Sequence, residues 1–381
     1  MRSFSNELQL ILESSRLRVD EQIILNLLKN IDWEFFIHLA YMHGVLPVVY
    51  KTLKVFKDNI PQNFFEKLSL LYKEIACNNL IATSELLKVV TYLQNRGVDV
   101  IAFKGPLLSD MAYGDITLRQ YADIDILVPQ EQLLKLSNLL IKEGYTSPSS
   151  TTLLEDKSFL ELNNDFNFYS SNNIHIEVHW KLIREQITLY EQNTIFENSS
   201  SQFLQGVMLK TLNIEMNIIY LALHGSKHGW ERIEWINDLY YLIEKFDVDW
   251  NRVLRLTEHF QCKPSLLLGI GLVGSLYGIQ LPIFLKESLE NSATEIAIEK
   301  VYGFLRENIV LEENYKKYQK INLFQFRLIN SKKRKTIHFF NTYFAISRND
   351  HLTIGLPSKL YFLYYFIRPF RVFFKFFIKR K

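Results

Sequence analysis

Two short stretches of strict alternation constrain the fold of this chain more than any other feature. Polar and apolar side chains alternate from Asp123 to Ile126 within residues 123–128 (DIDILV) and throughout residues 174–180 (IHIEVHW). In a β-strand, a period of two places alternate side chains on opposite faces. The sequence therefore predicts two strands, each with an apolar face that needs a core and a face that carries charged groups.

The chain on either side of these stretches has helical spacing. Up to about residue 94, apolar residues recur at intervals of three and four, and one long helical pattern begins at Pro61 and stops before Gly97. Helical spacing returns after about Gly206 and continues over most of the remaining chain. These patterns predict an α+β fold, with a small mixed sheet between an N-terminal and a C-terminal helical region.

Shorter patterns fill in the predicted core. Residues 98–103 (VDVIAF) predict a buried strand, 104–106 a turn, 107–113 a short helix and 130–143 a longer one. Residues 166–169 predict a strand, and the Ser-Ser-Asn-Asn turn at 170–173 joins it to 174–180 as a hairpin. Residues 148–150 and 198–201 are predicted surface loops. The predicted units are a helical region (1–96), an α/β core (97–205), a helical domain (206–350) and a C-terminal helix (351–381).

Composition narrows the class of protein. Hydrophobic residues at 48% and charged residues at 22% are typical of a globular chain rather than a disordered or fibrous one. Only Cys77 and Cys262 are present, which excludes a disulfide framework and fits a reducing compartment. Residues 1–15 contain no continuous apolar stretch of the kind found in signal peptides. We therefore expect a cytoplasmic protein.

The net charge of +3 is unevenly distributed. Residues 356–381 contain seven Lys or Arg and no acid, so the rest of the chain carries −4. Because the chain outside residues 356–381 is acidic, we do not expect it to bind nucleic acid in general. In the C-terminal segment, Arg368, Arg371, Lys375 and Lys379 follow one helical face, and Phe366, Phe370, Phe373 and Phe377 follow the opposite one. This pattern indicates a basic amphipathic helix that either packs its Phe face on the domain or docks on a membrane surface or partner.

Three carboxylates form the main candidate site. Asp123 and Asp125 share one strand face, where they repel each other unless a cation lies between them. Glu177 lies on the polar face of the second strand and would join them if the two strands are neighbours. Carboxylate and phosphate oxygens are the ligands that Mg²⁺ prefers, so the three acids predict a site for Mg²⁺, or Mn²⁺ in its place, that holds a triphosphate. The alternative is an acidic strand face in contact with solvent.

Basic residues near the acids predict phosphate contacts. Lys104 and Gly105 follow a buried strand and open a helix, a position where backbone N–H groups and a lysine receive phosphate. Arg119, four residues before Asp123, is a second candidate. The alternative for both basic side chains is ordinary surface charge.

Three histidines are weaker candidates for nucleotide binding. His179 shares the strand face of Glu177, where it would orient a carboxylate, contact phosphate or serve only the structure. His224 and His228 are spaced i, i+4 and share a helix face. With Asp238 they suggest a zinc site, but we favour a role in lining the nucleotide cleft. The structural alternative is packing between the helical domain and the core.

These motifs together resemble a known family. FKGPLLSDMAYGDITLRQYADIDILV, then IHIEVHW, then LALHGSKHGWERIEWINDLYYL, is similar to the uncharacterised nucleotidyltransferase family of bacteria, within the polymerase-beta-like nucleotidyltransferase superfamily. The resemblance spans roughly residues 20 to 310. It implies that Asp123 and Asp125 are metal ligands and that Glu177 is the third acid, as ligand or base. Lys104-Gly105-Pro106 stands where many relatives carry Gly-Ser, a departure that affects the usual γ-phosphate contact.

The function that the resemblance implies is transfer of a nucleoside monophosphate from an NTP to a hydroxyl acceptor, with release of pyrophosphate. An alternative from another class is a nucleotide-binding or scaffolding protein whose transferase site has decayed, because the serine that usually follows the glycine is missing. A third hypothesis, a membrane-docked partner of another enzyme, rests on the C-terminal helix alone. The sequence does not identify the acceptor or the base of the NTP.

Overall fold

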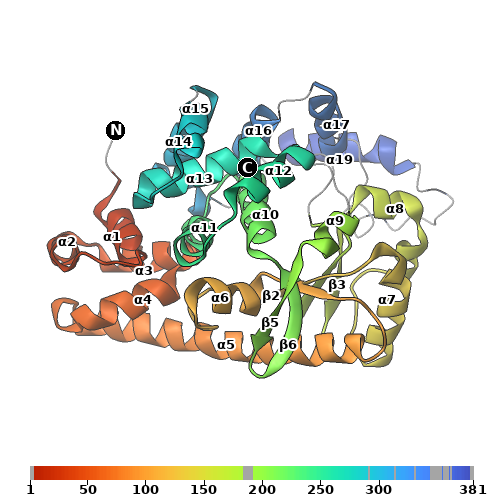
Figure 1. Cartoon of the computed structure of the whole chain (residues 1–381), viewed down its shortest axis with the longest axis horizontal. Helices are drawn as coiled ribbons and strands as arrows, with labels where there is room; N and C mark the ends of the chain where they lie inside the picture. Colours follow the sequence, from red (N-terminus) through yellow and green to blue (C-terminus); the bar gives the residue numbers. More distant parts are fainter. Residues whose placement is uncertain are drawn as a thin grey trace.

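Figure 1 shows the computed structural model, which describes residues 4–182, 192–290, 292–312, 315–329, 332–343, 354, 360 and 363–377. A four-stranded mixed sheet lies between helices that precede and follow it in the chain. The predicted α+β class, a small mixed sheet with helical flanks, is therefore confirmed. The division into four units at residues 96, 205 and 350 remains a prediction.

The N-terminal region is helical, as its spacing predicts. Two of its helices begin at aspartate caps, because Asp20 and Asp32 accept hydrogen bonds from backbone N–H groups of the first turn. The last helix, α5, has 33 residues and extends along the lower edge of the view in Figure 1. The elements are α1 (Asn6–Ser14), α2 (Glu21–Leu27), η1 (Leu28–Asn30), α3 (Trp33–Met42), α4 (Leu46–Leu53), η2 (Lys54–Asn59) and α5 (Gln62–Gln94).

The sheet has the order β1-β2-β4-β3. Neighbouring strands are antiparallel except for the central pair β2 and β4, which is parallel. β3 and β4 form the predicted hairpin, whereas only the last three residues of the predicted strand 98–103 pair in the sheet. The strands are β1 (Ile101–Phe103), β2 (Asp123–Leu127), β3 (Asp165–Tyr169) and β4 (His175–His179), and the helices among them are α6 (Gly105–Tyr113), η3 (Gln130–Gln132), α7 (Leu133–Lys142), η4 (Thr151–Glu155), α8 (Lys157–Leu162) and α9 (Gln192–Glu197).

The two faces of this sheet are covered differently. Ile124 and Ile126 of β2 are fully buried in one hydrophobic core with Ile176 and Val178 of β4, the C-terminal half of α5 and helix α7. The opposite face carries the acidic side chains and, through Phe103, adjoins the larger core of the helical regions. The alternation seen in the sequence thus separates a core face from a polar face, as predicted.

A second sheet contradicts the prediction that helices resume after Gly206. β5 (Ser199–Leu204) and β6 (Val207–Leu212) form an antiparallel hairpin, and Ser199–Ser201 belong to its first strand instead of the predicted loop. The Ser-rich start of β5 resembles a loop because most of that strand is not buried. Gln205 and Gly206 both have positive φ, 50° and 83°, as a two-residue hairpin turn of type I′ requires.

The described residues after β6 are mainly helical. In the described residues, no helix combines the length and apolar character needed to cross a membrane. Lys379 of the predicted basic face lies outside the described residues, as do the side chains of Phe373, Lys375 and Phe377. The elements are α10 (Ile214–Lys227), α11 (Ile233–Lys245), α12 (Trp250–His259), α13 (Lys263–Tyr277), α14 (Ile283–Leu289), α15 (Ser292–Arg306), η5 (Ile309–Leu311), α16 (Tyr315–Leu328), α17 (Lys332–Tyr343) and α19 (Tyr364–Phe377).

Candidate active site

The parallel pairing of β2 with β4 brings the three predicted carboxylates together. In this register Asp125 lies opposite Glu177, and Asp123 lies opposite His175. Because side chains alternate between the two faces of a sheet, Asp123, Asp125 and Glu177 all lie on the polar face. β4 therefore lies beside β2, as is required for Glu177 to join the two aspartates.

Asp125 is the centre of this cluster. Its side chain is fully buried, and its Oδ1 atom lies 3.3 Å from Nζ of Lys104 and 3.0 Å from Nε2 of His179. Its Oδ2 atom is buried and has no hydrogen-bond partner. A buried carboxylate oxygen without a partner is costly, so this atom is available to a cation or a donor from a ligand.

Glu177 and His175 complete the cluster on the β4 side. Nε2 of His179 is 3.3 Å from Oε2 of Glu177, so this histidine lies between two carboxylates. Nε2 of His175 is 3.9 Å from Oε1 of Glu177, and its ring stacks on Tyr169 with 4.9 Å between centroids. Glu177 is only partly buried, so the cluster is open to solvent on this side.

The pKa shifts in the cluster follow from burial and from the close packing of carboxylates around two cations. Burial, and then the charge of Asp125, raise the pKa of Asp123 above its usual value. Burial opposes ionisation of Asp125 as well, but Lys104 and the hydrogen bond from His179 hold the pKa of Asp125 well below its usual range. Burial lowers the pKa of His179, yet Asp125 and Glu177 together raise it to about 9. The cluster therefore favours cations at several positions.

Lys104 reaches Asp125 from a strained turn. Its backbone has φ 54° and ψ −150°, a conformation that residues other than glycine rarely adopt, and Gly105 follows with φ 42°. Helix α6 begins at Gly105, so its first N–H groups lie at the end of the turn that carries the lysine. A lysine persists in such a conformation only when the surrounding structure holds it there.

An aromatic row on α10 extends from Lys104. The lysine Nζ lies 5.5 Å from the ring centroid of Tyr220, and the next two turns of the helix bring His224 and His228. Ring centroids are 5.8 Å apart between Tyr220 and His224 and 4.7 Å apart between the two histidines, so they share a face as predicted. Burial, followed by nearby lysines, lowers the pKa of both histidines well below the usual value, so both are neutral.

Arg119 is engaged away from the acid cluster. Its Nε atom donates to both carboxylate oxygens of Asp238 at 3.0 and 3.1 Å, and its Nη2 lies 3.0 Å from Oε1 of Glu234. Tyr113 also donates to Asp238, at 2.9 Å. All these side chains are buried. The prediction that Arg119 binds phosphate stays untested, and its guanidinium joins the loop before β2 to helix α11.

The donor set of the cluster suits a divalent cation. Among the described residues, two groups offer at least three His, Asp or Glu ligand atoms within 4.8 Å of one another: Asp123 with His175 and Glu177, and Asp125 with Glu177 and His179. Both are rich in carboxylate oxygens, and Asp125 supplies the buried oxygen without a partner. His224, His228 and Asp238 do not form such a group, so the suggested zinc site is not assembled.

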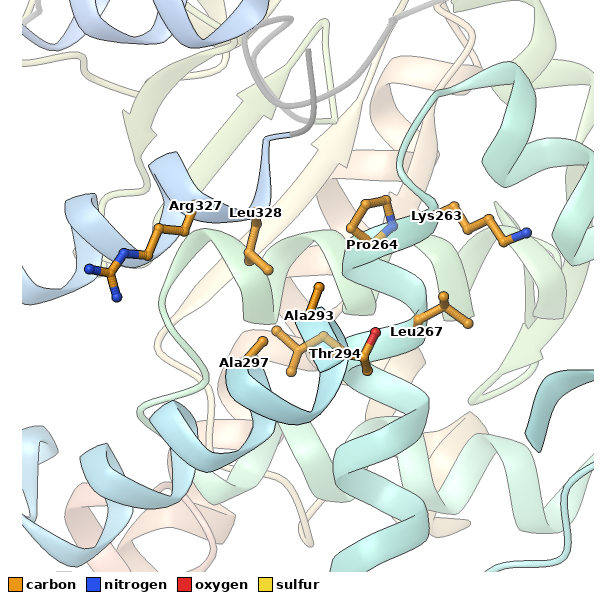
Figure 2. Close-up of a pocket in the computed structure, with 9 residues that line it drawn as sticks. Lys263, Pro264, Leu267, Ala293, Thr294, Ala297, Arg327 and Leu328 are labelled. Carbon is orange, nitrogen blue, oxygen red and sulfur yellow. The ribbon is translucent and has the colours of Figure 1, made fainter. Parts of the chain in front are cut away.

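A separate cavity of about 250 Å³ lies between helices α13, α15 and α16. Figure 2 shows the charged ends of Lys263 and Arg327 pointing away from it on opposite sides, so apolar side chains such as Leu267 and Leu328 line it. None of the predicted site residues contributes to this cavity. The cavity is therefore separate from the acid cluster.

Comparison with known proteins decides the family. A family model described as uncharacterised nucleotidyltransferase matches residues 29–278, well over half of the chain. The chain belongs to this family. It is accordingly a nucleotidyltransferase, and nucleotidyl transfer is its class of reaction. The matched region contains β2, β4 and the aromatic row of α10. No curated protein matches the sequence.

Two residues of the site were not among the predicted ones. The alternation of β4 places His175 on the face of Glu177, so the sequence contained a signal for it. Tyr220 had no such signal, because its place beside Lys104 depends on how α10 packs on the sheet.

Proposed function

We propose that this nucleotidyltransferase moves a nucleoside monophosphate from an NTP to a hydroxyl acceptor in a metal-dependent reaction that releases pyrophosphate. One observation carries the proposal: the parallel register of β2 and β4 gathers three carboxylates on one sheet face and leaves the buried Oδ2 of Asp125 without a partner. The polymerase-beta-like superfamily, suggested by the motifs, is part of this proposal.

Asp123, Asp125 and Glu177 would hold Mg²⁺, or Mn²⁺ in its place. When bound, the cation would neutralise phosphate charge and help to orient the attacking hydroxyl. Glu177 is the most accessible member, so we assign it the further role of accepting the proton of that hydroxyl. His179 fixes the orientation of both Asp125 and Glu177, because its Nε2 lies within 3.3 Å of each carboxylate.

The first turn of α6 would receive the phosphates of the NTP. Gly105 allows close approach of the backbone, and the N–H groups of Gly105 and Leu107, on either side of Pro106, carry the partial positive charge of a helix N-terminus. Lys104, beside Asp125, would contribute its ammonium group to the phosphates. This lysine replaces the hydroxyl that the usual Gly-Ser pair would supply.

The aromatic row would contact the nucleoside. Tyr220, His224 and His228 offer neutral ring faces one helical turn apart, starting at Lys104. Stacking of a base on such rings tolerates every base, in agreement with the absence of any base-reading motif. Arg119 would act indirectly, by fixing the loop that leads into β2.

The test is release of pyrophosphate from each NTP in the presence of Mg²⁺, with a cell extract as source of acceptors. We compare the wild type with Asp123→Asn, and with Glu131→Gln as a matched control. Glu131 is an exposed acid in η3, away from the polar sheet face. We expect release by the wild type and the control, and none by Asp123→Asn.

Calorimetry with the same proteins separates the alternatives. Metal-dependent NTP binding without pyrophosphate release under any acceptor condition would favour the nucleotide-binding or scaffolding function. Equal release by Asp123→Asn and wild type would reject the assignment of the carboxylates. Circular dichroism of each variant verifies that the fold is retained.

A further inference from the structure

The C-terminal layer of the molecule is strongly basic. Residues 315–381 contain sixteen Lys or Arg and one acid, a charge of +15, so residues 1–314 carry −12 of the total of +3. Helices α16, α17 and α19 lie along one edge of the molecule in Figure 1 (blue). The region matched by the family model ends at residue 278, before this layer. This charge thus lies outside the matched region, which contains all the proposed site residues.

Helix α19 presents apolar side chains outward. Phe366 and Phe370, one turn apart, are each 67% exposed, whereas Arg368 and Arg371 are partly buried. A terminal helix that only covers the domain would bury its phenylalanines and expose its arginines. In the described part of α19, the stripe of Phe residues predicted from the sequence does not pack on the protein.

Helix α17, which packs against α19, continues the same surface. Phe339 and Phe340 are about half exposed and Ile337 is also exposed, while Lys332 and Lys333 of the first turn are in solvent. Exposed phenylalanines and aliphatic residues beside lysines form a surface with two kinds of attraction, apolar and cationic. Contiguous exposed apolar groups of this kind mark interaction sites.

We propose that α17 and α19 dock this protein on an anionic phospholipid surface. The phenylalanines would enter the boundary between headgroups and acyl chains, and the excess of lysine and arginine would be attracted to anionic headgroups. Phe and Ile side chains favour lipid over nucleic acid, because an exposed isoleucine adds nothing to base stacking. The charge of +15 favours an anionic surface over an apolar protein partner.

Vesicle sedimentation with the full-length protein tests this proposal. The vesicles are phosphatidylcholine alone or with about one third phosphatidylglycerol. We expect binding to the anionic vesicles that is at least roughly tenfold tighter than to the neutral ones and that weakens as salt is raised. Because NTP and metal are omitted, the result does not depend on the proposed reaction.

Variants assign the binding to this surface. Phe366→Ala/Phe370→Ala should weaken binding to anionic vesicles roughly tenfold or more, because both side chains would leave the lipid boundary. Lys332→Glu/Lys333→Glu should weaken it to a similar degree and reduce its salt dependence. The matched control is Val55→Ala/Leu70→Ala, which removes apolar groups that are 77% and 65% exposed elsewhere and should leave binding unchanged.

Three outcomes would overturn the proposal. They are no binding to anionic vesicles, equal binding to neutral ones, or equal losses in the control and the phenylalanine variant. Two further measurements test other partners for this surface. Fluorescence anisotropy with labelled single-stranded and duplex DNA tests nucleic acid, and light scattering without vesicles tests a second copy of the chain. If the protein bound nucleic acid more tightly than vesicles, nucleic acid would be the partner in place of lipid. If it self-associated and Phe366→Ala/Phe370→Ala abolished this, the partner would be a second copy of the chain.

Discussion

Two charged clusters lie next to each other in this molecule, and they balance their charge differently. In the cluster around Arg119, one guanidinium faces Asp238 and Glu234, and all three side chains are buried. In the cluster around Asp125, three carboxylates face Lys104 and His179, with His175 beside Glu177 at the edge. Arg119 precedes Asp123 by only four positions in the sequence.

The difference lies in whether the protein alone neutralises the charge. Burial raises the pKa of Glu234 to about 8, so this carboxyl holds a proton at neutral pH and the Arg119 cluster is balanced. The Asp125 cluster has three carboxylates around the two cations Lys104 and His179, and a buried oxygen without a partner. A balanced cluster stabilises the fold, whereas an unbalanced one favours a ligand.

The largest effect is expected for Asp123→Asn, which should affect the reaction and not the stability of the fold. Asp123→Asn should lower the rate of pyrophosphate release at least about 10³-fold, or ~4 kcal/mol of barrier, because one ligand of the proposed metal site is lost. Its stability should not fall, since the raised pKa of Asp123 shows that the fold disfavours this charge. Initial rates and urea unfolding of the same preparation measure both quantities.

The counterpart in the other cluster is Asp238→Asn. It leaves Arg119 with Glu234 as its carboxyl partner, so we expect a clear loss of stability and only a minor change in rate for the folded fraction. If Asp238→Asn abolished turnover without loss of stability, the division into a structural and a functional cluster would be wrong.

Arg119→Met should be the most destabilising change of the set, by about 3 kcal/mol, because it leaves the buried carboxylate of Asp238 without a cation. Methionine preserves most of the side-chain volume, so the loss reflects charge more than packing. Urea unfolding measures it, and NTP affinity measured on the folded variant tests the predicted phosphate contact. Loss of affinity at unchanged stability would assign Arg119 to the nucleotide site.

The fold could be predicted where burial imposes a period on the sequence. The strand around Asp123 and the strand around Glu177 each place alternate apolar side chains in the core, so the alternation revealed both strands, and the Ser-Ser-Asn-Asn turn located the hairpin. The β5–β6 hairpin was not predicted, because the first residues of β5 are polar and not buried. Gln205-Gly206 was the available signal for it.

The site could be predicted as far as strand geometry determines it. Face parity alone placed Asp123 with Asp125 and identified Glu177, but the parallel register that joins them comes from packing of the whole sheet. Arg119 shows the limit. Its partners are more than a hundred residues away on α11, and no local pattern relates a loop to a helix at that separation.

The stability of the protein as a function of pH tests whether Glu234 of the Arg119 cluster is protonated. Glu234 has a folded pKa of about 8, raised by burial, above the unfolded value of about 4.5. The stability due to its proton is therefore complete below about pH 4.5 and is lost as pH rises towards 8. Glu234→Gln should remove this loss, so its advantage over wild type should grow across the window, by at most about 1.4 kcal/mol per pH unit.

Urea unfolding of both proteins at about pH 5 and about pH 8 checks this prediction. A difference between the two proteins that stays constant with pH would mean that Glu234 is ionised in the folded state. The Arg119 cluster would then carry a net charge, and the contrast with the Asp125 cluster would weaken.

The smallest effect concerns backbone strain, which is found in the unbalanced cluster at Lys104. Lys104→Gly and Lys104→Ala both remove the ammonium group beside Asp125, so they differ only in how the backbone tolerates φ 54° and ψ −150°. We expect the glycine variant to be more stable than the alanine variant by about 1 kcal/mol, because relief of strain exceeds the entropic cost of glycine. Both should lose activity. Equal stability in urea unfolding would mean that the turn relaxes without the lysine, whereas greater stability of the glycine variant would mean that the fold tolerates strain at this position to keep a cation at the carboxylates.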